Sequence, residues 1–191
     1  MADKDCGRLI IRDGGSIDLA TDQGKAALTG WDAGEGKEIC CVYKFTIHFP
    51  SDAIGSTSGT YNERDAAFVQ AQLQANGRKI GVICPGTYDI YYVSGITSQG
   101  CGGLVCSCYA NYVVTPLGPL PGHVGAQTGS ANNSAAREGL ERLKGQPVRY
   151  RSSEKQDFLV GFWPVHYNAY SNGSMTWKIV PVSGMVAEWN P

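Results

Sequence analysis

The stretch from Ile90 to Ala136 contains no Asp, Glu, Lys or Arg. About a quarter of the residues of an average domain are charged, so an uncharged segment of this length is unusual. Such a segment depends on Ser, Thr, Asn, Gln and Gly for its contact with water. Charge is characteristically depleted in the core of protein contacts. The stretch therefore favours a protein that assembles with other subunits over an enzyme.

Length and charge balance indicate a single domain spanning residues 1–191. A chain of 191 residues can bury a sufficient apolar core without disulfides or metals. Its formal net charge is −1, so no overall field attracts it to nucleic acid or to an anionic membrane surface. The expected partners are copies of itself or other subunits of an assembly, and not nucleic acid.

The N-terminal residues Met1–Asp5 are polar, and no apolar segment of signal-peptide length follows them. We therefore expect synthesis in the cytoplasm without a classical signal peptide, with a virion as a further candidate location. No segment approaches the roughly 20 apolar residues of a membrane span. Seven cysteines, an odd number, without an export signal favour reduced thiols over a disulfide framework.

Alternation of apolar and polar residues is clearest in Cys40–Phe49 and predicts a strand with one buried face. Shorter segments rich in β-branched and aromatic residues have the composition of strands as well. These further predicted strands are Arg8–Arg12, Lys79–Cys84, Thr87–Val93, Leu104–Val114, Phe158–Val165 and Met175–Val182.

Two segments have the periodicity of short helices, Glu63–Ala75 and Ser134–Lys144. Each is short enough to cover a sheet rather than to build a bundle. The expected fold class is therefore α+β and β-rich. It consists of an antiparallel sheet or sandwich with two short covering helices and a long Pro/Gly-rich loop or arm.

Two segments predict turns or connections. Asn172-Gly173 is the pair that accepts positive φ in a tight hairpin, so we expect a C-terminal β-hairpin there. Pro116–Gly122 is too rich in proline for a helix or a central strand and is expected to be an extended connection. Residues 115–135 then form either an extended arm or a flexible loop.

No cofactor or metal site is predicted. Cys101, Cys106 and Cys108 come near the spacing of plant-type iron–sulfur proteins but have one residue too few between the last pair. Zinc would need a second paired Cys or Cys/His motif, and none stands at the required spacing. The two later cysteines are better interpreted as small buried residues of a strand.

A thiol nucleophile needs a histidine to generate its thiolate and a third group to orient that histidine. The weak candidates for such a site are Cys40 or Cys41 with His166. They define one alternative function, a Cys/His-dependent hydrolase or effector.

Aromatic residues gather near the predicted C-terminal hairpin. Aromatic rings serve sugar stacking, protein contacts and core packing alike. A second alternative is therefore a carbohydrate-binding β-sandwich. The residues that would bind the glycan are Trp163, Tyr167, Tyr170 and Trp177.

The first hypothesis is a structural subunit of a homo-oligomeric or virion-like assembly, such as a phage tail or capsid component. It would contact its neighbours through the uncharged segment. The predicted contact residues are Leu117, Pro119, Leu120, Pro121 and His123.

Overall fold

The computed structural model describes eleven ranges of the chain, and all structural statements below concern these. They are 4–11, 16–18, 21–23, 42–49, 51–55, 66–101, 107–108, 112–120, 127–128, 144–163 and 169–191.

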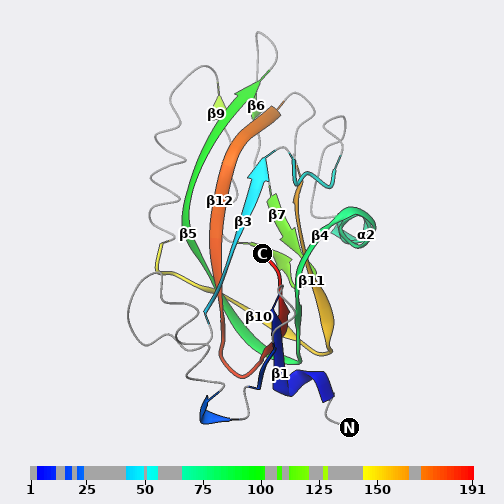
Figure 1. The fold of residues 1–191 in the computed structure, drawn as a ribbon. Coiled ribbons are helices and arrows are strands. Elements are labelled where there is room, and N and C mark those ends of the chain that lie inside the picture. Colours follow the sequence, from blue (N-terminus) through cyan, green and yellow to red (C-terminus); the bar gives the residue numbers. More distant parts are fainter. Residues whose placement is uncertain are drawn as a thin grey trace.

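Most of these residues lie in β-strands (Figure 1). A 3-10 turn, η1 (Lys4–Gly7), precedes the first strand, and an α-helix, α2 (Ala66–Asn76), follows the third. The strands are β1 (Arg8–Ile11), β2 (Ser16–Asp18), β3 (Tyr43–Phe49), β4 (Arg78–Ile83), β5 (Gly86–Cys101), β6 (Ser107–Cys108), β7 (Tyr112–Thr115), β8 (Gly118–Pro119), β9 (Gln127–Thr128), β10 (Val148–Ser152), β11 (Gln156–Trp163), β12 (Ala169–Pro181) and β13 (Val186–Trp189).

Two sheets face each other and enclose the main core. The larger sheet has seven strands in the order β2-β1-β13-β4-β11-β7-β8, and the smaller has four in the order β10-β5-β12-β3. The pairing of β1 with β13 is parallel, and the other pairings in both sheets are antiparallel. A further short pair joins β6 to β9. The β-rich α+β class predicted from the sequence is confirmed, whereas the larger sheet is mixed rather than purely antiparallel.

The alternation predicted for the third strand is confirmed. Tyr43, Phe45 and Ile47 are buried in the core between the sheets, whereas Lys44 and His48 lie on the opposite face of β3. The partner strand β12 has the same periodicity, and its buried face includes a tryptophan that stacks on β3. The ring centroids of Trp177 and Phe45 are 5.9 Å apart at an interplanar angle of 21°.

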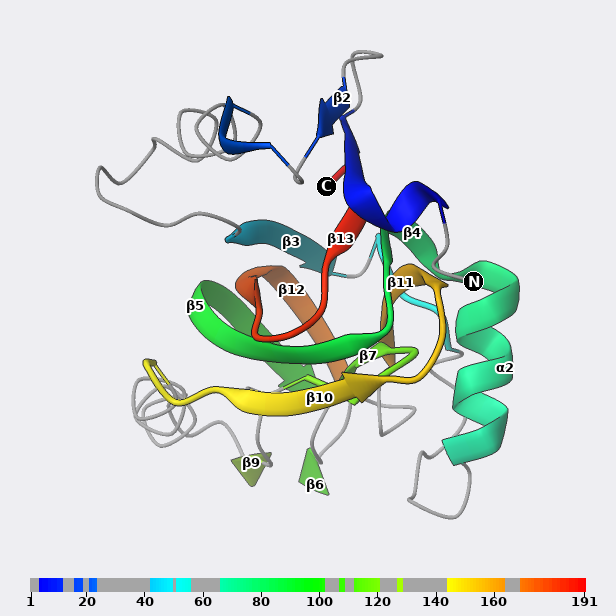
Figure 2. The same cartoon turned by 90° about the horizontal axis from the view of Figure 1, so that it is seen from below.

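Strand β11 is buried on both faces, which explains its continuous apolar sequence. Phe158 and Val160 face the smaller sheet, while Leu159 and Trp163 pack beneath α2 with Leu73. Helix α2 therefore covers the outer face of the larger sheet, beside β11 and β7 (Figure 2). The first predicted helix is thus present, beginning at Ala66 in the described residues. The second, Ser134–Lys144, lies outside them except for Lys144, which bridges to Tyr92.

The prediction of a hairpin turn at Asn172-Gly173 is wrong. Both residues lie inside β12, opposite Ser98 and Thr97 of β5. Gly173 also pairs with Phe49 of β3. A position with strands on both sides gains two ladders of backbone hydrogen bonds, which outweigh the local turn preference of this dipeptide.

Pro116–Gly122 does not begin as an extended connection. Pro116 and Leu117 form a tight turn between β7 and β8. The Thr115 hydroxyl accepts a hydrogen bond from the Leu117 amide at 3.1 Å and donates one to the Gly118 carbonyl at 2.9 Å. Pro116 thus lies in a turn and Pro119 in a two-residue edge strand, positions that tolerate a missing N–H. Of the predicted arm or loop over residues 115–135, positions 121–126 and 129–135 lie outside the described residues.

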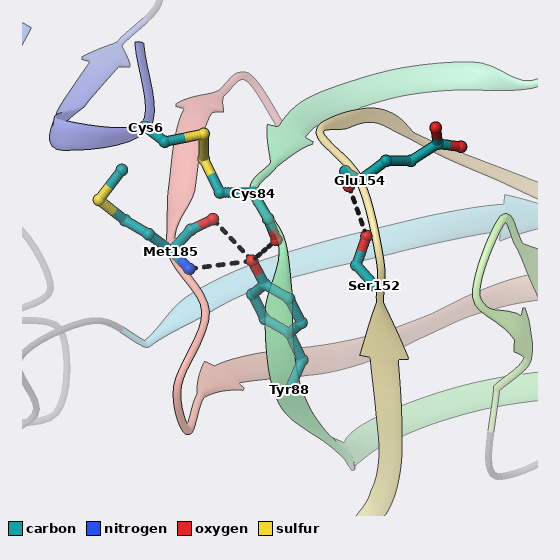
Figure 3. The surroundings of a disulfide bond; sticks show 6 residues. All are labelled: Cys6, Cys84, Tyr88, Ser152, Glu154 and Met185. Atoms are coloured by element: carbon teal, nitrogen blue, oxygen red, sulfur yellow. Dashed lines mark hydrogen bonds between the residues drawn. A yellow bond between two sulfur atoms is a disulfide. The ribbon is translucent and has the colours of Figure 1, made fainter. Parts of the chain in front are cut away.

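The chain crosses between the sheets at one end of the sandwich, where three short corners lie together (Figure 3). They are residues 84–85 between β4 and β5, 153–155 between β10 and β11, and 182–185 between β12 and β13. We call them the corner cluster.

The Tyr88 hydroxyl joins two of these corners. Its oxygen lies 2.5 Å from the Cys84 carbonyl oxygen and 2.7 Å from that of Met185, and it accepts a hydrogen bond from the Met185 amide at 2.9 Å. The Cys84 amide donates to the Met185 carbonyl at 2.8 Å. Gly86, with φ of 147°, brings its backbone so close that an added Cβ would lie 2.3 Å from the Gly184 Cα.

The third corner is held by a buried serine. Ser152 pairs with Gly86 at the end of β10, and its hydroxyl donates to the Glu154 carbonyl at 2.7 Å. The Gln156 side chain donates to the same hydroxyl at 2.8 Å. All three crossings are therefore fixed by hydrogen bonds that do not depend on the strand ladders.

A disulfide between Cys6 and Cys84 attaches η1 to the corner cluster. The expectation of reduced thiols is wrong for these two residues, because the fold brings positions 78 residues apart in the chain to a Cα–Cα distance of 5.8 Å. Spacing along the sequence gave no sign of this pairing.

Replacing both bridged cysteines by alanine should lower the free energy of unfolding by about 2–4 kcal/mol, because the unfolded chain loses a long closed loop. Thermal unfolding with and without a thiol reductant measures the effect. The reductant should lower the Tm of the native protein and leave that of the Cys6→Ala/Cys84→Ala variant unchanged. An equal Tm for the native protein in both conditions would contradict the bridge.

Tyr88→Phe should lower the free energy of unfolding by about 1–3 kcal/mol, because it leaves the buried backbone groups of Cys84 and Met185 without the hydroxyl that they share. Burial raises the pKa of Tyr88 from 10.0 to about 12. Its contribution is therefore complete below pH 10 and is lost as the pH rises towards 12, because the unfolded chain ionises first. Urea denaturation at neutral and alkaline pH tests both effects. Tyr91→Phe, on the same strand, is the matched control and should change the unfolding free energy by less than about 0.5 kcal/mol.

Candidate functional site

The predicted thiol site consists of Cys40 or Cys41 with His166. Cys40, Cys41 and His166 lie outside the described residues. Across the described ranges, no group of three or more His, Cys, Asp and Glu side chains is placed to hold a metal ion. No helix in those ranges is long and apolar enough to span a membrane.

The predicted glycan-binding tryptophans are core residues. Trp177 is 0% exposed between the two sheets, and Trp163 is 5% exposed beneath α2. Their rings are therefore covered by protein and offer no face to a sugar. Tyr170 lies in β12 opposite Gly100, and Tyr167 lies outside the described residues.

The predicted contact residues also take different places. Leu120 is buried in the main core and Leu117 packs against it. Pro119 is exposed, and its carbonyl accepts a hydrogen bond from the Tyr150 hydroxyl. Burial raises the pKa of that tyrosine. This part of the uncharged stretch thus joins β8 to β10 within one molecule, and Pro121 and His123 lie outside the described residues.

Folding pairs the uncharged stretch with a second uncharged segment, Phe158–Trp177. Strand β5 pairs with β12 in the smaller sheet, and β7 pairs with β11 in the larger one. The ladder of Ser94–Cys101 against Ala169–Thr176 contains no Asp, Glu, Lys or Arg on either strand. We call this ladder the uncharged ribbon. The sequence displays both segments, but their pairing becomes visible only in the fold.

Part of the uncharged ribbon extends beyond its neighbouring strands. The last pair between β12 and β3 is Gly173 with Phe49, whereas β12 continues to pair with β5 as far as Ala169 and Cys101. Figure 1 shows β5 and β12 reaching past the tip of β3, at the end of the sandwich away from the corner cluster.

One edge of the uncharged ribbon has no described strand beside it. Strand β10 pairs with β5 only as far as Ile90, and an isolated bridge joins Tyr92 to Lys144. Over Ser94–Cys101 the described residues supply a partner on the β12 side alone.

The opposite edge of the smaller sheet is closed by side chains. The Arg78 guanidinium donates to the Thr46 carbonyl of β3 at 2.5 Å, and its Nε lies 3.4 Å from Asp52 Oδ1. The other carboxylate oxygen of Asp52 accepts a hydrogen bond from the His48 amide at 2.8 Å, and the Asp52 amide donates to the His48 carbonyl. An added strand would have to displace these contacts from β3.

The outer edge of β10 carries charge and follows a proline. Arg149 makes two hydrogen bonds to Asp89 of β5, at 2.9 and 3.0 Å, and the hydrogen bond to this carboxylate raises the pKa of the guanidinium. Arg151 is also exposed, and Pro147 precedes the strand. Arginine and proline on an edge oppose pairing with another strand. The short edge strand β8 likewise ends in a proline, Pro119.

The outer face of the smaller sheet is polar beside the charged edge. Lys178 Nζ lies 4.9 Å from the centre of the Tyr91 ring, directly across the β5–β12 ladder. Thr46 and Thr176 share a hydrogen bond of 2.8 Å across β3 and β12. These are internal cross-strand contacts of a solvated face.

No protein-family model, no curated protein and no solved structure matches this chain. The candidate site is therefore defined by geometry alone. It is the uncharged ribbon formed by β5 and β12.

Arg78→Met should lower the free energy of unfolding by about 1.5–3 kcal/mol, because it removes a charged donor from the Thr46 carbonyl and the ion pair from Asp52. Chemical denaturation measures the change. Lys79→Met is the matched control: its ammonium lies 3.1 Å from the exposed Asp157 carboxylate, and such surface pairs contribute at most about 1 kcal/mol. An equal fall in the free energy of unfolding for the two variants would show that Arg78 does not close the β3 edge.

Proposed function

We propose that this protein is a structural subunit of a homo-oligomeric or virion-like assembly. The observation that carries the proposal is the uncharged ribbon. Two segments far apart in the sequence, both without charge, lie side by side at the end of the sandwich that extends beyond β3. Charge depletion is a property of the core of protein contacts.

The contrast among the sheet edges supports the same function. Arg78 and Asp52 occupy the β3 edge, and Arg149 and Arg151 lie along β10, whereas Ser94–Cys101 carries neither charge nor proline. A protein that acts alone gains from closing every strand edge, because open edges promote aggregation. The lack of charge and proline in Ser94–Cys101 favours contact of this segment with another protein surface.

The proposed contact surface lies on the uncharged ribbon rather than on the hairpin of β7 and β8. Leu120 and Leu117 already contribute to the core of their own molecule. Their apolar surface therefore adds little to a contact between subunits.

The disulfide between Cys6 and Cys84 favours a working location outside a reducing cytoplasm. A particle released from its host cell meets this condition. A virion or an extracellular assembly is therefore the proposed location, with oxidation following synthesis.

The mass of the purified protein in solution tests the proposed function. Light scattering during size-exclusion chromatography should give a multiple of the 20.4 kDa chain mass, or larger rings and filaments. The measurement is made without reductant, so that the disulfide is kept. A monomer that persists at high protein concentration would overturn the proposal.

A further inference from the structure

We propose that the disulfide of Cys6 and Cys84 is a redox-sensitive lock, which holds the N-terminal segment on the sandwich and releases it on reduction. The segment is Lys4–Ile11, which comprises η1 and β1, and we call it the N-terminal cover. Its release uncovers part of the larger sheet while the sandwich stays folded. The inference goes beyond the proposed function and does not depend on the oligomeric state.

The N-terminal cover lies against a small apolar cluster of the larger sheet. Val82, Cys84 and Ala187 are buried together in this cluster, which is separate from the main core, and Cys6 and Met185 pack against it. Figure 3 shows the bridge reaching from η1 to the end of β4. The disulfide thus keeps the cover where it shields apolar side chains of the sandwich from water.

The described noncovalent contacts of the cover with the sandwich are limited. Strand β1 pairs with β13 at two positions, Ile10 with Glu188 and Ile11 with Trp189. Leu9 is buried in the main core, whereas Ile10 is 42% exposed. The other neighbour of β1 is the three-residue strand β2, which ends the described sheet. Ordering each residue of the cover costs conformational entropy, so contacts this limited leave it dependent on the covalent link.

The corner at the other end of the bridge is held independently of the disulfide. The Tyr88 hydroxyl makes hydrogen bonds with the backbone of Cys84 and Met185, and the Cys84 amide donates to the Met185 carbonyl. Breaking the sulfur–sulfur bond removes none of these hydrogen bonds. Reduction therefore loosens the cover and leaves the corner cluster in place.

The reductant that the bridge requires is a dithiol, acting by thiol–disulfide exchange. Cys84 is 3% exposed and Cys6 is more exposed, so the incoming thiolate attacks the Cys6 sulfur. A mixed disulfide forms at Cys6, and Cys84 leaves as a thiolate.

The second thiol of the reductant completes the exchange. It attacks the reductant's own sulfur in the mixed disulfide, which closes a disulfide within the reductant and expels Cys6 as a thiolate. Two electrons pass from the dithiol to the bridge. The two protons that the dithiol loses are taken up by the two cysteine thiolates.

Amide hydrogen exchange of the native protein, with and without a dithiol, tests the lock. Mass spectrometry follows Arg8–Ile11 and, as an internal control, residues 176–179 of β12, which pair with both β3 and β5. Both samples are kept at a temperature where circular dichroism shows the reduced protein to be folded. Reduction should accelerate exchange in Arg8–Ile11 at least tenfold and in the control residues less than twofold. Reoxidation should restore the slow exchange.

Cys6→Ala is the matched variant, because it removes the bridge and leaves the buried Cys84 side chain in its cluster. Arg8–Ile11 should exchange rapidly in this variant, and the dithiol should change its rate less than twofold. Alkylation of Cys6 in the native protein, measured during the same dithiol treatment, establishes that the bridge opens while the sandwich is folded.

Three outcomes would overturn the inference. Slow exchange in Arg8–Ile11 after reduction would show that noncovalent contacts hold the cover without the bridge. Equal acceleration in the control residues would show that the bridge supports the whole sandwich. A bridge that resists the dithiol until the protein unfolds is not a switch. None of these readouts depends on the mass of the protein in solution, so the proposed function is tested separately.

Discussion

The fold depends on the hydrogen bonds of a single buried phenol. The chain passes between the two sheets at three corners, and the Tyr88 hydroxyl reaches the backbone at two of them, at Cys84 and Met185. Each crossing is only a few residues long, so the strands on either side have little freedom to adjust. The relative position of the two sheets, and with it the packing of Phe45 against Phe158 and Trp189 across the core, follows from how this end is held.

Regular patterns in the sequence predicted those elements that have one buried face and one solvent-facing side. The third strand has one buried and one polar face, and alternation located it. The Asn172-Gly173 pair failed as a turn signal because β5 pairs with both residues and β3 pairs with Gly173 as well. Such long-range pairing is not recorded in any local pattern. The same limitation hid the disulfide of Cys6 and Cys84, which depends on how η1 lies against β4.

The candidate site was partly visible in the sequence. The uncharged stretch from Ile90 includes β5, whereas the contact residues predicted from the sequence lie around the turn between β7 and β8, near Leu117 and Leu120. Those leucines are apolar because they complete the core of their own molecule. Trp163 and Trp177 were predicted to bind a glycan but are buried, because an aromatic side chain suits a core and a binding face equally well. Only burial separates the two roles.

The uncharged ribbon contrasts with the strand edges of the same sheet that carry charged side chains. Arg78 is held against both the Thr46 carbonyl and the Asp52 carboxylate, so a long and flexible side chain closes this part of β3. Ordering such a side chain costs conformational entropy, so its presence indicates that an open edge at β3 would be harmful. The same molecule leaves Ser94–Cys101 without a charge or a proline. Charged side chains therefore lie along both described edges of the smaller sheet, β3 and β10, and the uncharged ladder begins where β10 ends.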